Sequence, residues 1–462
     1  MKNYSLKAGM GVILGGLALF LLPGLSQAIP SFARQTGMSC SACHTVFPEL
    51  TTYGRTFKLN GYTTTNTDGV KDPSEGDGPK RLDIQAVPPL SAMLQISDAF
   101  VKKPASTAAG VADSASDQNG SVEFPTQFSL FYAGRISPQM GAFLQLTYDS
   151  ASGAFGIDNT DVRFADRIQV ANTDLIYGIT ANNNPTVQDV FNTVPAWSFP
   201  YFGANTGMGP LAATQLESQG TNVGGLGAYV FWNQLLYAEI AAYRSVPQGL
   251  VGANPTDPSV LDAYNAIQGF APYWRVALTQ DFDKNSVEVG ILGMDTHSVP
   301  SGELLLGPQD HFSDFGVDAQ YQYVTQEHCF TLKGSEIWEN QTWDYSNGVG
   351  LTGGGAVANP TDTLRSFKMD LTYYYNRMIG ATVGYFSTTG SGDAGIYSVN
   401  ASATPDTEGF IAEINFVPWY NTKLGLQYTY FDKFNGSIDN YDGTGTHATD
   451  NNTLVASAWL MY

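Results

Sequence analysis

Three residues near the start of the chain have the types and the spacing needed to attach a haem group covalently. Cys40, Cys43 and His44 form a C-x-x-C-H pattern. In this pattern the two thiols bond to the vinyl groups on one edge of the porphyrin, and the imidazole that follows reaches the iron as its proximal ligand. Because the chain of 462 residues holds only three cysteines and five histidines, chance is a poor explanation for the pattern. We therefore expect one covalently bound haem c.

Two other chemistries are open to the same cysteines, which could form a disulfide or supply half of a zinc site. Zinc would need further ligands nearby, and the next histidine after His44 is His297. A redox-active C-x-x-C pair is typically found at a helix start in a thioredoxin-type fold, and the sequence shows no sign of that fold. Haem attachment is therefore the favoured interpretation.

The sequence does not identify the sixth ligand of the iron. Met93, Met140 and Met208 are weak candidates, because each is explained at least as well as a lipid-facing or gap-filling side chain. Met38 is too close to Cys40 to reach across the ring. The remaining histidines fall in or near predicted loops and strand ends, where solvated side chains are the ordinary expectation: His297, His311, His328 and His447.

Residues 1–28 predict a signal peptide. Lys2 and Lys7 precede an apolar core over residues 10–22, and residues 26–28 (Ser-Gln-Ala) offer small side chains to a signal peptidase. The core is shorter than the roughly 20 residues that a membrane-spanning helix needs. We expect cleavage after residue 28 and export, which agrees with haem attachment in the periplasm.

From residue 83 onward, apolar and polar residues alternate over successive segments. Leu424 and Leu426, for example, alternate with Gly425 and Gln427, so the apolar side chains share one face of a strand. The connections between such segments alternate between tight turns and long loops. About sixteen strands are predicted, at residues 88–98, 124–134, 139–149, 160–168, 173–181, 222–232, 234–244, 271–282, 285–296, 312–324, 327–338, 364–375, 378–388, 407–417, 421–432 and 451–462.

An even number of strands, with short turns on one side and long loops on the other, is typical of bacterial outer-membrane barrels, because closure satisfies every backbone hydrogen bond in lipid. The chain ends in an apolar row that includes Leu454, Leu460 and Tyr462, which resembles the assembly signal of such barrels. A soluble β-sandwich also alternates, but its strands tend to be shorter. We therefore predict an all-β fold, in which residues 83–462 form a porin-like transmembrane barrel of about 16 strands, with both ends of the chain at the periplasmic side.

Residues 29–82 remain for the segment that carries the predicted haem. Tyr53, Phe57, Leu59 and Tyr62 could cover part of a porphyrin, but a segment of this size buries too little surface to be stable alone. A barrel of about sixteen strands has a lumen wide enough for a plug. We therefore predict that residues 29–82 insert into the periplasmic end of the barrel and pack against its walls.

The composition restricts the classes of function. Charged residues make up 14% of the chain, aromatic residues make up 13%, and the net charge is −20. This excludes a disordered chain, and the lack of a basic cluster excludes a nucleic-acid partner. Acidic residues outnumber the three lysines of the predicted long loops, Lys102, Lys103 and Lys433. The negative electrostatic field of these loops could concentrate Fe²⁺ or another small cation, although a role in solubility explains the excess of acidic residues equally well.

Several polar residues fall on the predicted lumen-facing side of the strands, where they suit a hydrated lumen or a braced plug. They are Glu239, Arg275, Asp318, Lys368, Asp370 and Glu413. The third cysteine, Cys329, lies within a predicted strand, and we expect it to be an inert filler.

The stretch around the C-x-x-C-H pattern resembles the fused monohaem cytochrome-porins of bacterial outer membranes, a family that includes the iron(II) oxidases of chemolithotrophic bacteria. The similar residues are 30–37, 40–44, 47–50 and 54–59, with further similarity at 183–189 and 195–197. The resemblance implies haem attachment at Cys40 and Cys43, His44 as an iron ligand, and electron transfer through the outer membrane. It does not fix the substrate.

The leading hypothesis is an outer-membrane electron conduit. An extracellular donor, with Fe²⁺ favoured, would pass electrons by way of the haem to a periplasmic c-type cytochrome or another soluble carrier. The alternatives are a diffusion porin whose haem segment is a structural or regulatory plug, electron export to an extracellular acceptor, and a haem enzyme such as a peroxidase. Barrels of this size are commonly homotrimers, but nothing in the sequence demands one.

Overall fold

The computed structural model describes residues 30–64, 69–70, 84–103, 120–150, 152–194, 199–200, 209–210, 212–220, 223–245, 266–299, 307–347, 357–398 and 400–462. The predicted signal peptide, residues 195–197 and Met208 lie outside these described residues.

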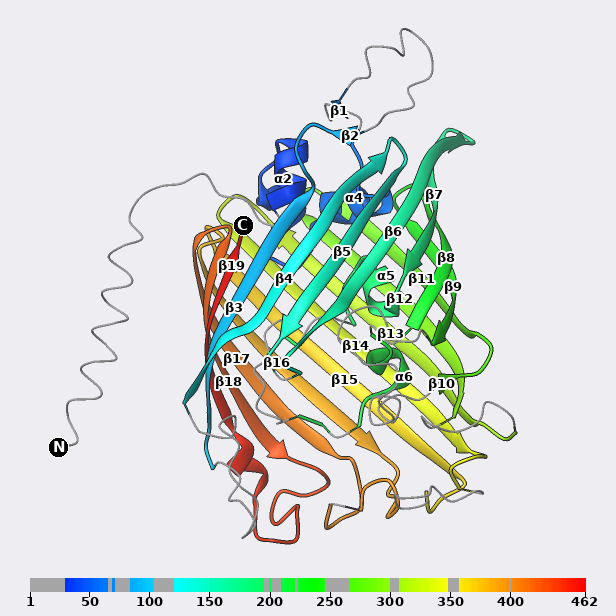
Figure 1. Cartoon of the computed structure of the whole chain (residues 1–462), viewed down its shortest axis with the longest axis vertical. Helices are drawn as coiled ribbons and strands as arrows, with labels where there is room; N and C mark the ends of the chain where they lie inside the picture. The colour runs from blue at the N-terminus through cyan, green and yellow to red at the C-terminus, as the bar shows by residue number, and fades with distance from the viewer. Residues whose placement is uncertain are drawn as a thin grey trace, which may run out of the picture.

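Sixteen of the described strands form a closed antiparallel barrel, which confirms the predicted fold class (Figure 1). Neighbours in the chain are neighbours in the sheet, and the ring closes where β9 pairs with β11 and β19 pairs with β3. The barrel strands are β3 (Leu90–Val101), β4 (Ser121–Ser137), β5 (Met140–Asp149), β6 (Ala154–Val170), β7 (Thr173–Asn182), β8 (Val223–Trp232), β9 (Leu236–Ser245), β11 (Ala271–Phe282), β12 (Asn285–Val299), β13 (Asp310–Val324), β14 (His328–Trp343), β15 (Thr361–Tyr375), β16 (Ile379–Gly390), β17 (Thr407–Trp419), β18 (Thr422–Lys433) and β19 (Thr453–Met461).

Three shorter strands lie outside this ring. The two-residue strand β10 (Ala266–Ile267) pairs with the end of β12. Strands β1 (Gly69–Val70) and β2 (Ile84–Gln85) pair with each other in a separate two-stranded sheet.

Seven tight turns are at one end of the barrel, as predicted. At the other end, the connection between β5 and β6 is shorter than the loop predicted there, because β6 begins at Ala154, five positions after the end of β5. Three of the turns at the first end place consecutive residues in the left-handed region. They are Ala171 and Asn172 (φ 51° and 63°) between β6 and β7, Asn233 and Gln234 (φ 53° and 52°) between β8 and β9, and Asn376 and Arg377 (φ 50° and 54°) between β15 and β16. Such pairs match the twist of antiparallel hairpins. The carboxyl terminus is at this end too, because the backbone of Tyr462 exchanges hydrogen bonds of 2.7 and 2.8 Å with Ala92 at the start of β3.

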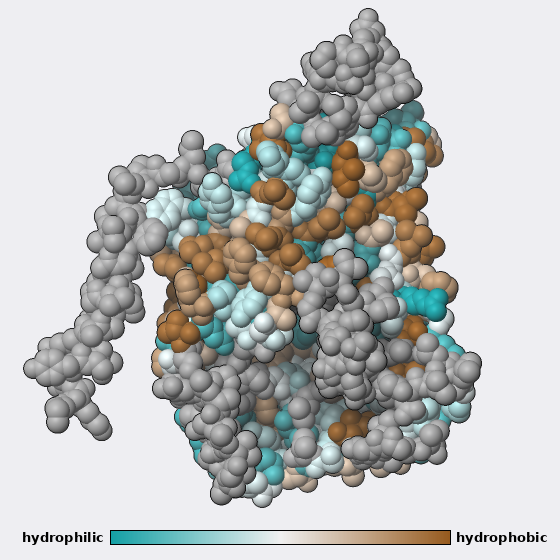
Figure 2. Space-filling view, viewed as in Figure 1, coloured by the Kyte–Doolittle hydropathy of each residue, from teal (hydrophilic) through white to brown (hydrophobic). Residues whose placement is uncertain are grey.

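The outer surface of the barrel is apolar and its lumen is polar. Leu226, Ile240 and Ile414 point outward and are 64%, 67% and 64% exposed, and Figure 2 shows hydrophobic residues gathered across the middle and upper part of one face. The six polar residues predicted to face the lumen do so. A closed barrel with this division is the architecture of bacterial outer-membrane proteins, so the outside of the barrel contacts lipid.

Among the described residues, no helix is both long and apolar enough to cross a membrane.

Three short helices lie across the short-turn end of the barrel: α2 (Pro30–Thr36), α3 (Cys40–Cys43) and α4 (Thr52–Leu59) (Figure 1). The buried guanidinium of Arg55, on α4, connects them to the wall by donating hydrogen bonds to Ser286, Gln320 and Gln322 at 2.8, 3.0 and 2.9 Å. On the opposite side Phe57 packs in one cluster with Trp459 and other residues of the barrel wall. Residues 30–64 therefore pack against the barrel through both apolar and polar side chains.

The connection between β7 and β8 enters the lumen, which the sequence did not predict. It carries two one-turn helices, α5 (Pro185–Gln188) and α6 (Gln215–Ser218), inside the barrel (Figure 1). The amide of Gln188 donates to Glu239 on the wall at 2.8 Å, and the backbone N–H of Leu216 donates to Asp314 at 2.7 Å. The loop therefore fills lumen space that would be open in an empty barrel.

A buried ion network fixes this inward loop to the wall. Arg275 on β11 is fully buried and pairs with Asp189 of the loop at 3.3 Å and with Glu288 and Asp318 of the wall at 3.0 and 2.5 Å. The ring of Phe191 lies between two guanidinium groups, 5.1 Å from that of Arg275 and 5.7 Å from that of Arg55. The wall, the inward loop and the N-terminal helices thus form one packed unit.

Candidate functional site

The C-x-x-C-H pattern forms a single helical turn that the next helix holds in place. The hydroxyl of Thr51 caps α4 by accepting from the N–H of Gly54 at 3.1 Å, and the same hydroxyl donates to the carbonyl of Ala42 at 2.7 Å. A Cβ at Gly54 would lie 2.2 Å from the carbonyl oxygen of Cys43, so only glycine permits this approach. The local sequence therefore fixes α3 against α4.

His44 follows α3 directly, and its ring is oriented by a backbone carbonyl. The Nδ1 atom lies 3.2 Å from the carbonyl oxygen of Glu49, a partner to which it donates when Nε2 is the unprotonated nitrogen. Burial lowers the pKa of His44 to about 4, so the ring is neutral near pH 7. A neutral imidazole, held at one nitrogen and free at the other, is the form that binds a metal.

The carboxylate of Glu49 is fixed in turn by the barrel. It accepts a hydrogen bond from Thr45 at 2.9 Å and lies 3.7 Å from the ammonium group of Lys333 on β14. The same ammonium group lies 3.7 Å from Asp370 on β15. The position of the carbonyl that orients His44 therefore depends on strands far away in the sequence.

Cys40 and Cys43 are both free thiols, so the disulfide alternative has no support in the structure. Burial raises the pKa of Cys43 to about 11, with a smaller contribution from Cys40. Reactive C-x-x-C pairs have a lowered thiol pKa, so this pair lacks the signature of a thiol redox centre. In the part of the chain that the structure describes, neither cysteine belongs to a three-residue cluster suited to a metal ion, which leaves the zinc alternative without a third ligand.

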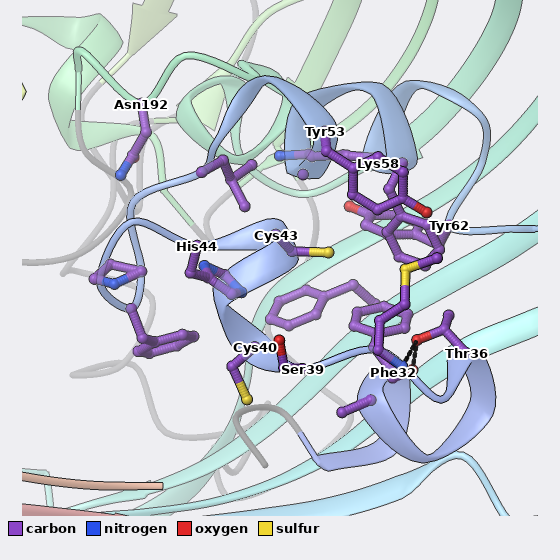
Figure 3. Close-up of a pocket in the computed structure, with 18 of the residues that line it drawn as sticks. Phe32, Thr36, Ser39, Cys40, Cys43, His44, Tyr53, Lys58, Tyr62 and Asn192 are labelled. Carbon is purple, nitrogen blue, oxygen red and sulfur yellow. Dashed lines mark hydrogen bonds between the residues drawn. The ribbon is translucent and has the colours of Figure 1, made fainter. Parts of the chain in front are cut away.

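A cavity of about 1010 Å³, which includes the solvent at its mouth, opens beside Cys40, Cys43 and His44. Figure 3 shows the sulfur of Cys43 directed into this space, toward the side where Phe32 and Tyr62 lie. Free thiols, an oriented imidazole and an apolar cavity together fit a haem held by Cys40 and Cys43 with His44 on its iron.

The residues predicted to cover a porphyrin are mostly in this cavity. Tyr53, Phe57 and Tyr62 line it. Leu59 does not, because it packs on the other side of α4 against Ile176 and other wall residues. The periodicity of the helix separates Leu59 from Phe57, because Leu59 lies two positions later and therefore just over half a turn away.

Neither Met93 nor Met140 lines the cavity, and Met208 lies outside the described residues. Met93 is 3% exposed and packs in the same cluster as Cys40, whereas Met140 is at the β4–β5 turn. Met38, which is too close to Cys40 in the chain to reach across a haem ring, lines the cavity. Met461 lines a smaller space of about 450 Å³ between Cys40, His44 and the wall.

Part of the cavity is formed by residues that sequence reasoning missed. Thr186, Asp189 and Asn192 of the inward loop line it, as does Lys58 of α4. The ammonium group of Lys58 donates to the carbonyl oxygen of Asp189 at 3.0 Å and to that of Val187. The similarity at residues 183–189 was the only signal in the sequence that connected this loop with the haem segment.

No protein-family model matches the sequence, and no curated protein sequence matches it either. Among solved structures, the chain is similar to the outer-membrane channel DcaP of Acinetobacter baumannii, with 13% identity and a TM-score of 0.44 over 85% of this chain and 99% of that one. The outer-membrane-expressed OmpT of Vibrio cholerae has 8% identity and a TM-score of 0.43 over 81% and 97%. The anion-selective porin from Comamonas acidovorans has 12% identity and a TM-score of 0.42 over 81% and 98%.

Proposed function

We propose that this protein is an outer-membrane electron conduit of the cytochrome-porin type, which takes electrons from extracellular Fe²⁺ and delivers them to a soluble electron carrier in the periplasm. Cys40 and Cys43 would hold the haem through thioether bonds, and His44 would bind its iron. The bound haem would supply a one-electron redox centre. One observation supports this proposal above all: the free thiols and the carbonyl-oriented imidazole border one cavity in the mouth of a closed barrel.

The filled lumen also favours electron transfer over solute diffusion. Residues 30–64 occupy the short-turn end, and the inward loop with Asp189 and Phe191 occupies part of the interior. A donor that gives up an electron at the cell surface does not need to diffuse through the lumen. This suits iron, because the Fe³⁺ product precipitates near neutral pH.

The negative charge of the long loops supports a cationic donor, but fewer acidic residues contribute to it than the sequence suggested. Asp189 and Glu217 belong to the longest of these loops, yet both lie in the lumen, where they pair with Arg275 and Lys368. The remaining acidic loop residues are those that would attract Fe²⁺ from outside. Asp442 is one of them, and its carboxylate is already bonded to the hydroxyls of Thr444 and Thr446.

Rapid mixing of the haem-loaded protein with Fe²⁺ tests the donor. We expect the absorption bands of the reduced haem to appear within seconds, because the electron needs only to reach the cavity. The matched control is mixing with Zn²⁺, which has the same charge and no accessible redox chemistry. A spectrum that stays oxidised for minutes, in protein that dithionite reduces fully, would contradict iron oxidation. A midpoint potential well below that of the Fe³⁺/Fe²⁺ couple would instead favour electron export.

The ammonium group of Lys58 gives the same proposal a pH signature. Burial lowers the pKa of Lys58 from 10.5 to about 8, so its charge is present at pH 7 and is lost as the pH rises through about 8. A cation lining the cavity favours the ferrous over the ferric state, because the ferric state carries one more positive charge. We therefore expect the midpoint potential to fall as the pH rises from 7 to 9.

The substitution Lys58→Met should lower the potential at pH 7 and remove the inflection near pH 8. Redox titration of the haem absorption at several pH values measures both effects. Lys102→Met is the matched control, because Lys102 is an exposed lysine at the long-loop end. An unchanged inflection in the Lys58→Met protein would show that another group is responsible.

A further inference from the structure

We propose that Asp295, His297 and His311 form a binding site for a divalent transition-metal cation such as Zn²⁺ on the outer surface of the barrel. Asp295 and His297 are on β12, and His311 is on β13, on either side of the loop that joins these strands. The site is at the long-loop end of the barrel. It is therefore separate from the cavity beside His44 and does not depend on the proposed function.

The register of the two strands brings the three side chains together. His297 is directly opposite His311, and Asp295 is two positions before His297, so all three share one face of the sheet. The Nε2 atom of His311 lies 2.8 Å from one carboxylate oxygen of Asp295, and that of His297 lies 3.5 Å from the other. One ligand atom from each residue lies within 4.8 Å of the others, so small side-chain rotations suffice to bring them around one ion.

The shared face is the outside of the barrel. Thr296 and Ser298, which alternate with the site residues along β12, are 0% and 1% exposed, whereas the side chains of His297 and Asp295 are 48% and 42% exposed. The three ligands are therefore accessible to an ion from solution.

The site is beyond the apolar band. On the same outer face, Phe315 packs between Trp274 and Trp338, with ring centroids 6.4 and 6.1 Å away. Aromatic residues of this kind mark the membrane interface of barrels. His311 is four residues closer to the long-loop end than Phe315, which is about 14 Å along a strand. The ligands therefore lie at the level of the lipid headgroups or the water above them.

The donor set specifies the class of ion. Imidazole nitrogens select borderline cations such as Zn²⁺, whereas Ca²⁺ and Mg²⁺ require mostly oxygen ligands. The rings of His297 and His311 stack with centroids 4.2 Å apart and an interplanar angle of 3°. In this arrangement each ring can direct a nitrogen lone pair toward one ion that Asp295 also binds. The open coordination positions can be filled by water.

Titration of the full-length, haem-loaded protein with Zn²⁺ in detergent tests the proposal. Calorimetry should show a site that binds one Zn²⁺ per chain, and zinc X-ray absorption should show two imidazole ligands. The double variant with His297→Ala and His311→Ala should bind Zn²⁺ at that site more weakly by well over about tenfold, since even second-shell changes cost 10–100-fold. Retained stoichiometry and affinity in this variant would overturn the proposal, as would a spectrum with sulfur or oxygen ligands alone.

Two further variants make the result unambiguous. His447→Ala is the matched control, because His447 also pairs with a carboxylate, that of Asp439 at 2.8 Å, but among the described residues it belongs to no group of three possible metal ligands. It should leave Zn²⁺ binding unchanged. Asp295→Asn keeps both imidazole rings and the shape of the surface. It replaces the double variant as the test if the double variant does not show the heat-dependent gel shift of a folded barrel. Unchanged affinity in Asp295→Asn would count against the site.

Discussion

Replacing both Cys40 and Cys43 with serine is expected to abolish covalent haem attachment and leave the barrel folded. The thiols are the only atoms of the motif that can form thioether bonds, and serine preserves the size and helical position of each side chain. The contacts that hold α3 in place involve Thr51, Gly54 and backbone carbonyls, so they persist in the variant. Haem-dependent peroxidase staining of denatured protein should change from a clear band to none.

The third cysteine provides a matched control. Cys329 is 2% exposed in the wall of the barrel, where it packs against Tyr374 and Val417. The variant Cys329→Ser should therefore retain haem at the level of the unsubstituted protein. A haem band that persists in the Cys40 and Cys43 double variant, or disappears in Cys329→Ser, would refute the assignment of the attachment site.

The same double variant separates the two main functional hypotheses. If the protein is an electron conduit, the haem-free variant should not oxidise Fe²⁺. If it is a diffusion porin, the variant should retain its solute flux. The gel shift on heating, which reports a closed barrel, shows that the loss is not due to misfolding. Full Fe²⁺ oxidation by haem-free protein would remove the basis of the electron-conduit proposal.

The barrel could be predicted because its signals are local. The alternation of Leu424, Gly425, Leu426 and Gln427 is a property of neighbouring residues, and these residues face alternately outward and inward in β18. Turn residues such as Asn376 mark the hairpins for the same reason. Each strand then pairs with its neighbour in sequence, so the topology required no long-range information.

The cavity could be predicted only in part, because its second half depends on contacts distant in sequence. The motif gave Cys40, Cys43 and His44, and the nearby aromatic residues gave three of the four predicted cavity positions. The inward course of the β7–β8 loop depends instead on the ion pair between Asp189 and Arg275 of β11, which is 86 positions away in the sequence. No local pattern marks that pairing, so the loop read as an ordinary external loop.

Arg275→Met should destabilise the protein by about 3–5 kcal/mol, the cost usual for breaking a buried ion pair by removing one partner. The guanidinium is fully buried between Asp189, Glu288 and Asp318. Methionine fills much of the space but leaves these three carboxylates without their shared cation in the lumen. Unfolding by urea in detergent micelles, followed by tryptophan fluorescence, measures the change in the free energy of unfolding.

A surface ion pair serves as the control for this loss. Arg167 pairs with Asp174 at 3.4 Å, and its side chain is 47% exposed. Exposed pairs of this kind contribute little, so Arg167→Met should change the free energy of unfolding by no more than about 0.5 kcal/mol. Equal effects of the two substitutions would show that the buried network does not stabilise the protein as we infer.

The same substitution should also open a path through the barrel. Without Arg275, the carboxylate of Asp189 is repelled by Glu288 and Asp318, and Phe191 loses one of its two cationic neighbours. The interactions that hold the inward loop in the lumen are then weaker, so ion conductance across a planar bilayer should rise above that of the unsubstituted protein. Adding Asp318→Asn removes one of the repelling charges and should partly reverse the rise. Conductance that is unchanged by Arg275→Met, in protein with the expected loss of stability, would mean that residues 30–64 close the barrel without the loop.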